Sequence, residues 1–244
     1  FFDIDTNPAK WGFMRACTAI FRDRAVRPLE TVKVLRVAGL PAEVGTLARF
    51  YSQHGSNMLN VLTGTCGIAY QDMLKSRVIP NYENVAAGLA GRNSTSMTWD
   101  VDSDGKGFYS VVSPQAKVYS GHANRFESET KGAVRLTAPE LVTFAMTPLD
   151  RGSKILITAC GRCENTGMQF SADRRTVGRN WGGAPVQVEA VKGTVVLPEG
   201  KWTCHALAPD GKPRQEVRVT YQNGQATLAM SPEYGTMWYL LERQ

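Results

Sequence analysis

Two cysteines stand at the spacing that metal and redox sites use. Cys160 and Cys163 form a C-x-x-C motif in a chain that holds five cysteines. A structural zinc site needs a second pair of ligands, and the nearby candidates are Cys204 and His205. A redox motif needs a helix directly after it, whereas residues 164–167 have the composition of a turn. We interpret both cysteines as small buried side chains, with metal, disulfide or redox roles as alternatives, and we expect no metal and no cofactor.

An acidic run offers a second kind of site. Asp100, Asp102 and Asp104, followed by Gly105, match the opening of a calcium-binding loop. The twelfth position of such a loop supplies a bidentate Glu, and here it is Val111. The same residues fit a hairpin, with a turn at 103–107 between two strands, and we prefer that interpretation to calcium binding.

No catalytic set can be named from motifs. The chain has three histidines, and none lies in a His-Glu-x-x-His motif. No nucleophile elbow and no phosphate-binding glycine motif is present. We interpret His54, His122 and His205 as structural or surface residues. A Ser-His-Asp set is defined by geometry and not by order, so it stays open, and the catalytic residues are unknown.

Two segments carry the side chains that sugars need. A pyranose ring has an apolar C–H face that stacks on aromatic rings, and its hydroxyls bind planar polar groups. The candidate substrate-binding residues are Asp5, Asn7 and Trp11 in the first segment, and Arg162, Glu164, Asn165 and Trp181 in the second. The alternative for each segment is structural, with Trp11 packed in the core and residues 164–167 forming only a turn.

Composition narrows the partners of the chain. Hydrophobic residues make up 43% of 244 and charged residues 20%, which is typical of a folded protein with a sizeable core. The net charge of +6 is spread along the chain, and its densest basic patch, around Arg174 and Arg179, is short. We therefore expect no nucleic-acid partner. No apolar run reaches the ~18–20 residues of a membrane span, so we expect no membrane partner either.

The elements that must position these residues fall into three parts. Residues 1–28 read as a strand, a capping loop at Asn7-Pro8 and a helix that ends before Pro28, and the opening strand without a Met leads us to expect a truncated start. Residues 95–244 hold short alternating runs about every 8–15 residues, which predict an antiparallel β-sandwich. Residues 29–94 mix strand and helix patterns and form a connector that can contribute strands to this sandwich. The runs of the sandwich are 96–101, 108–113, 116–122, 133–138, 141–148, 154–160, 185–190, 193–197, 201–208, 214–221, 225–231 and 236–242.

The stretch from Ile155 onward resembles the C-terminal part of bacterial glycoside hydrolases that join a (β/α)8 barrel to a β-sandwich. The resemblance is carried by the segments 155–159, 164–168, 181–182, 193–195 and the aromatic strand 236–242. Residues 1–28 look like the last strand and helix of the barrel. The resemblance therefore implies a mainly β fold with a helical N-terminal part, in which an antiparallel sandwich follows a terminal piece of a barrel.

The same resemblance implies a function. The chain would be the C-terminal portion of a glycoside hydrolase that acts on a polysaccharide or oligosaccharide, with the sandwich bracing the barrel and contacting sugar. Such barrels place both catalytic carboxylates on earlier strands, so the chain alone is expected to lack them. Its partners would be the carbohydrate substrate and the upstream barrel, and we expect a secreted or periplasmic location. The alternative is a stand-alone carbohydrate-binding β-sandwich without catalysis.

Overall fold

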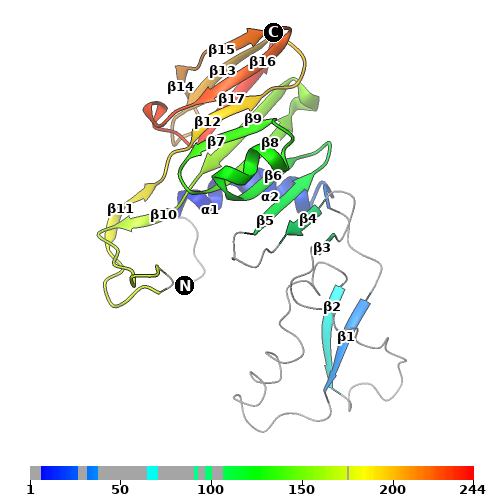
Figure 1. Ribbon diagram of the computed structural model, residues 1–244, viewed down its shortest axis with the longest axis vertical. Coiled ribbons are helices and arrows are strands. Elements are labelled where there is room, and N and C mark those ends of the chain that lie inside the picture. The colour runs from blue at the N-terminus through cyan, green and yellow to red at the C-terminus, as the bar shows by residue number, and fades with distance from the viewer. Residues whose placement is uncertain are drawn as a thin grey trace. The chain divides into compact units, whose positions relative to one another are not determined.

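The computed structural model describes residues 7–26, 32–37, 65–70, 91–92, 97–100, 107–174 and 176–244. Contacts divide the chain into a first unit, Phe1–Ala25 with Val112–Gln244, and a second unit, Val26–Val111. We describe each unit by itself (Figure 1). The expected strand at residues 1–5 and the expected turn around Asp104 lie outside the described residues.

The second unit contains two small groups of strands. β1 (Val32–Val37) pairs in parallel with β2 (Thr65–Tyr70). β3 (Gly91–Arg92), β4 (Met97–Asp100) and β5 (Phe108–Val112) pair antiparallel in that order. The hydroxyls of Thr98 and Ser110, which lie opposite each other, share a hydrogen bond of 2.6 Å. The expected strand at 108–113 is thus confirmed, and so is the described part, 97–100, of the expected strand at 96–101.

The first unit is built on a large antiparallel sheet. Its strands are β6 (Lys117–His122), β8 (Leu141–Leu149), β9 (Lys154–Cys160), β13 (Trp202–Leu207), β14 (Pro213–Glu216) and β17 (Trp238–Arg243). They pair in the order β6-β8-β9-β17-β13-β14. Short helical turns accompany them, η2 (Ala123–Arg125), α5 (Phe126–Glu129), η3 (Asp150–Gly152) and η4 (Pro232–Tyr234).

A smaller antiparallel sheet packs against this one and closes a core. It consists of β7 (Val134–Ala138), β12 (Lys192–Val196), β15 (Val219–Gln222) and β16 (Gln225–Met230), in the order β15-β16-β12-β7. Side chains alternate along a strand, so every second residue faces the partner sheet. The buried residues of the facing sides include Val195, Leu228 and Met230 from the smaller sheet and Phe144, Ile157, Tyr239 and Leu241 from the larger one. The expected antiparallel sandwich is confirmed as two packed antiparallel sheets.

Two short helices cover part of the outer side of the larger sheet. α1 (Pro8–Gly12) begins after Asn7, whose side-chain oxygen caps it, and α2 (Met14–Phe21) follows. The pattern predicted one helix, but the chain breaks at Phe13, where ψ is 4°. α2 packs on β8 through its small buried residues Ala16 and Ala19.

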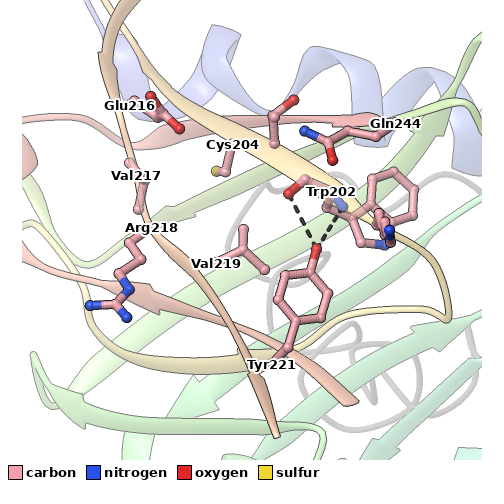
Figure 2. A pocket seen from close by; sticks show the side chains of 10 residues that line it. Trp202, Cys204, Glu216, Val217, Arg218, Val219, Tyr221 and Gln244 are labelled. Carbon is pink, nitrogen blue, oxygen red and sulfur yellow. Dashed lines mark hydrogen bonds between the residues drawn. The ribbon is translucent and has the colours of Figure 1, made fainter. Parts of the chain in front are cut away.

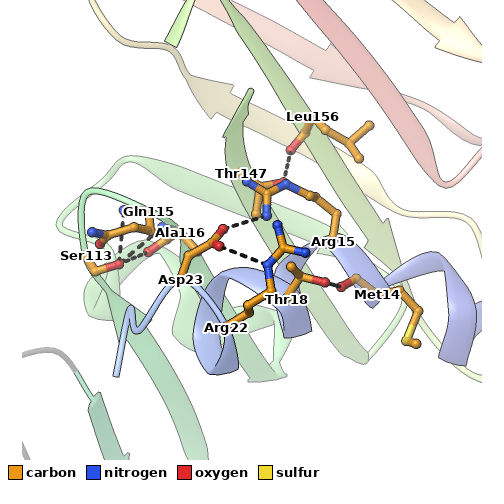
Figure 3. Close-up of polar contacts among 10 residues, drawn as sticks. All are labelled: Met14, Arg15, Thr18, Arg22, Asp23, Ser113, Gln115, Ala116, Thr147 and Leu156. Atoms are coloured by element: carbon orange, nitrogen blue, oxygen red, sulfur yellow. Dashed lines mark hydrogen bonds and ion pairs between the residues drawn. The ribbon is translucent and has the colours of Figure 1, made fainter. Parts of the chain in front are cut away.

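Polar contacts hold the second helix in place (Figure 3). Arg15 Nη1 lies 2.9 Å from Asp23 Oδ2, which closes the end of α2 back on its own first turn. Thr147, buried on the outer side of β8, donates to the carbonyl of Leu156 at 3.2 Å, so its hydroxyl is satisfied within the sheet. This explains how a polar residue is accommodated on a buried face.

A two-stranded arm leaves the sandwich after β9. β10 (Cys163–Thr166) pairs antiparallel with β11 (Gly183–Val188), and we call residues 163–188 the arm (Figure 1). Its base is tight, because a Cβ on Gly161 would lie 2.3 Å from Pro139 Cγ and 2.6 Å from Glu189 Oε2. The Gly161 and Glu189 backbones are joined by a hydrogen bond of 2.9 Å at the same point.

Two local predictions are wrong. Residues 163–166 form strand β10 and not a turn, which begins only at Gly167, where φ is +74°. The run 214–221 is not one strand, because the chain crosses from β14 in the larger sheet to β15 in the smaller sheet through the buried Val217. Alternation continues through this crossover in the sequence, so periodicity alone did not indicate it.

Candidate functional site

An apolar pocket of about 350 Å³ lies where the N-terminal helix, the arm and the larger sheet meet. We call it the tryptophan pocket. Its lining residues are Pro8, Trp11, Val186, Val188, Ala190, Leu207, Pro209, Gly235, Thr236, Met237 and Trp238. This volume lies within the range of small-molecule sites.

Two indole rings form the aromatic part of the tryptophan pocket. The ring centroids of Trp11 and Trp238 lie 5.1 Å apart at an interplanar angle of 34°. Trp238 Nε1 donates to the carbonyl of Gly12 at 3.2 Å. A Cβ on Gly12 would lie 2.8 Å from Met237 Cε, so glycine lets the helix approach the sheet this closely. The half-buried Trp11 thus fastens α1 to β17 and also borders the pocket.

The pocket can stack a ligand but has no acid or base of its own. None of its described lining residues is titratable. The hydroxyl of Thr236 is bonded to the carbonyls of Leu207 and Trp238, at 2.7 Å and 3.2 Å. Asn7 lies four residues before Trp11, and only its Oδ1 is used, accepting from Lys10 N at 3.1 Å. Its amide Nδ2 is a potential hydrogen-bond donor on the helix that carries Trp11.

The arm brings the second predicted segment to the same place. β11 supplies Val186 and Val188 to the pocket wall, and its partner residues on β10 are Asn165 and Cys163. Residues directly opposite each other in an antiparallel pair project from the same face. Asn165 therefore lies on the pocket face of the arm, next to Val186, whereas Glu164 lies on the other face.

The remaining residues predicted from the sequence lie at different places on the arm. Glu164 pairs with Arg174, away from the pocket face. Arg162 stands at the base of the arm, where its backbone donates to Glu189 Oε2 at 2.7 Å and its guanidinium lies 3.8 Å from Glu140. Asn165 Nδ2 donates to the carbonyl of Trp181 at 3.0 Å, and the Trp181 side chain is 60% exposed. Asp5 lies outside the described residues.

A second cavity, of about 520 Å³, opens between the two sheets at the edge formed by β13 and β15 (Figure 2). Tyr221 reaches across it from the smaller sheet, and its hydroxyl accepts from Trp202 N at 2.7 Å and donates to Trp202 O at 3.3 Å. In Figure 2 the Arg218 side chain points away from Trp202 and Cys204. The Tyr221 side chain in this cavity thus links the two sheets through its hydroxyl.

The cysteines and histidines form no further site in the described part of the chain. Cys17, Cys160, Cys163 and Cys204 are free, and burial is the main cause that raises the pKa values of Cys160 and Cys204 to about 12. His122 Nδ1 lies 3.7 Å from Glu140, and His205 Nδ1 is buried without a partner among the described residues. Within those residues no cluster of three metal-ligating side chains exists. His54 lies outside them.

Trp238 was not among the site residues predicted from the sequence. Its strand was expected, but the sequence does not show that Trp238 faces the helix while Tyr239 faces the core. Alternation between half-buried Trp238 and Leu240 and buried Tyr239 and Leu241 is the signal that separates the two faces.

No helix among the described residues is long and apolar enough to cross a membrane. Comparison of the chain with family models, curated proteins and solved structures finds no match, so the role of the tryptophan pocket is inferred from its own residues.

Proposed function

We propose that this chain is the C-terminal portion of a glycoside hydrolase. In this proposal the sandwich braces the last helix of a (β/α)8 barrel, and the tryptophan pocket contacts the saccharide. The catalytic carboxylates belong to the upstream barrel, and this chain binds and does not cleave.

The two-sided helix α2 is the observation that carries the bracing role. One side of α2 buries Ala16 and Ala19 near β8, while Phe21 is 89% exposed and Met14 51% exposed. Met14 and Phe21 are seven residues apart and therefore lie on the same side of α2, opposite Ala16 and Ala19, so two large apolar side chains form one exposed patch that can pack against another part of the protein. A barrel helix has this requirement, because it must cover the barrel strands on one side.

The make-up of the tryptophan pocket supports sugar contact. It offers the Trp11 ring for stacking, while Asn7 at the start of the same helix and Asn165 on the pocket face of the arm supply amides that can bind a hydroxyl. Aromatic rings combined with planar hydrogen-bonding groups suit pyranoses. The absence of a titratable group from its described lining fits binding better than hydrolysis.

Affinity electrophoresis of the purified chain through gels containing a panel of polysaccharides tests the sugar contact. We expect at least one polysaccharide to retard the wild-type chain. Val186→Trp should abolish the retardation by filling the pocket while leaving both native tryptophans in place, and Trp11→Ala should weaken it. Phe21→Ser is the matched control and should migrate like the wild type. Unretarded wild-type protein in every gel would contradict the proposal.

A further inference from the structure

An exposed tryptophan on the arm extends the tryptophan pocket. Trp181 is held from both sides, since its carbonyl accepts from Asn165 Nδ2 and the next residue, Gly182, donates to Asn180 Oδ1 at 3.0 Å. A Cβ on Gly182 would lie 2.4 Å from the carbonyl oxygen of Thr166, so the loop presses directly on β10. An exposed ring on a backbone fixed in this way is an ordered platform, and binding to it costs little ordering entropy.

The register of the arm places the backbone at Trp181 on the pocket side. Asn165 projects from the same face as its partner Val186, and its amide reaches Trp181 O from that face. Val186 and Gly183 are three positions apart on β11, which corresponds to at most about 10 Å of strand, and the register with β10 shifts between them. The Trp181 backbone therefore lies next to Asn165 on the pocket side of the arm, and its exposed indole can border the same surface as Trp11.

We propose that this surface binds a linear oligosaccharide across several sugar rings, with one ring over Trp11 in the tryptophan pocket and a later ring over Trp181. Aromatic rings separated by planar polar groups fit a sugar chain, because each pyranose presents a C–H face and a set of hydroxyls. This inference rests on the proposed function and adds that affinity grows with chain length.

The test measures binding against ligand length. Partial acid hydrolysis of the retarding polysaccharide gives a ladder from disaccharide to hexasaccharide, and titration calorimetry measures its binding to the 244-residue chain. We expect Trp181→Ala to weaken binding of the hexasaccharide roughly three- to tenfold, the range of one lost aromatic stacking contact, and to leave the disaccharide unchanged. Trp11→Ala should weaken every length.

Two further variants keep the result interpretable. Trp181→Tyr retains a ring and should restore most of the hexasaccharide affinity, while Phe21→Ser should bind every length like the wild type. Equal binding of the hexasaccharide by Trp181→Ala and wild type, with Trp11→Ala still weakened, would overturn the extended site and leave the proposed function standing. Failure of every polysaccharide to retard the wild-type chain would overturn both.

Discussion

At the residue scale, glycines allow close approaches between elements of the first unit. Gly161 lies where the chain leaves β9 for the arm, and Gly12 lies where α1 meets β17. Both positions have ordinary φ angles, so space and not backbone conformation requires glycine there.

Gly161→Ala should therefore destabilise the protein. The new Cβ would meet the Pro139 ring and the Glu189 carboxylate at under 3 Å, and overpacking of this kind costs roughly 1–3 kcal/mol. Urea unfolding followed by circular dichroism measures the change. Gly178→Ala is the matched control, because its Cβ would meet nothing within 4 Å. Equal stability of the two variants would show that the base of the arm is looser than these distances indicate.

A buried thiol and a buried tyrosine hydroxyl make the stability of the protein fall at alkaline pH. Burial raises the pKa of the Cys204 thiol from 9.0 to about 12 and that of the Tyr239 hydroxyl from 10.0 to about 12. Raised pKa values mean that the unfolded chain loses these protons first, so the stabilisation is complete below about pH 9 and is lost as pH rises toward 12.

We expect the melting temperature to fall between pH 9 and pH 12, and to fall less steeply in Cys204→Ala than in the wild type. Differential scanning calorimetry across this pH range measures both slopes. Cys17→Ala is the matched control, because it removes an exposed thiol in place of a buried one. A Cys204→Ala slope as steep as that of the wild type would contradict this assignment.

At the scale of elements, a tyrosine joins the two sheets at their open edge. The hydroxyl of Tyr221 on β15 bonds both the N–H and the carbonyl of Trp202 at the start of β13 (Figure 2). Removal of the hydroxyl leaves two backbone groups without this partner, and a lost hydrogen bond of this type costs about 1–2 kcal/mol.

Tyr221→Phe should lower the free energy of unfolding by that amount. Tyr234→Phe is the control, since Tyr234 contacts Tyr239 through its ring at 6.1 Å. Denaturant midpoints at constant m-value measure both variants. If Tyr221→Phe unfolds at the wild-type midpoint, water replaces the hydroxyl and the bridge contributes nothing.

The strands show how far local patterns predict elements. Turns whose residue types favour positive φ angles are predictable from the sequence. Asn223-Gly224 is an example, because it connects β15 to β16 and both of its φ angles are positive. β10 was not predictable, because its residues have turn-like composition and become a strand only through pairing with β11. Trp11 was recognised as an exceptional side chain, but its partner Trp238 lies near the other end of the sequence and is brought to it only by tertiary packing.

The exposed side of α2 leads to a prediction that distinguishes a surface packed against the barrel from a surface that stays in solvent. In the isolated chain Phe21→Ser should change stability by less than about 0.5 kcal/mol, as surface substitutions do. In the complete enzyme that we propose, Phe21 is buried against the barrel, and its loss should cost roughly 3 kcal/mol or more. Thermal unfolding of both proteins measures the difference. The same small effect in both would contradict the bracing role.

At the scale of the whole molecule, binding and cleavage belong to different parts of the enzyme that we propose. The tryptophan pocket lacks titratable groups among its described lining residues, and the Glu164 carboxylate of the arm is paired with Arg174. Glycoside hydrolysis needs two carboxyl groups on either side of the scissile bond. The described lining of the pocket contains no such pair.

The most direct measurement combines binding and turnover on the purified 244-residue chain. Affinity electrophoresis on the polysaccharide panel is run beside a reducing-end assay on the same polysaccharides. We predict retardation by at least one polysaccharide, lost in Val186→Trp, without release of reducing ends. Release of reducing ends by the chain alone, or migration of the wild type unretarded through every gel, would contradict the division between binding and cleavage.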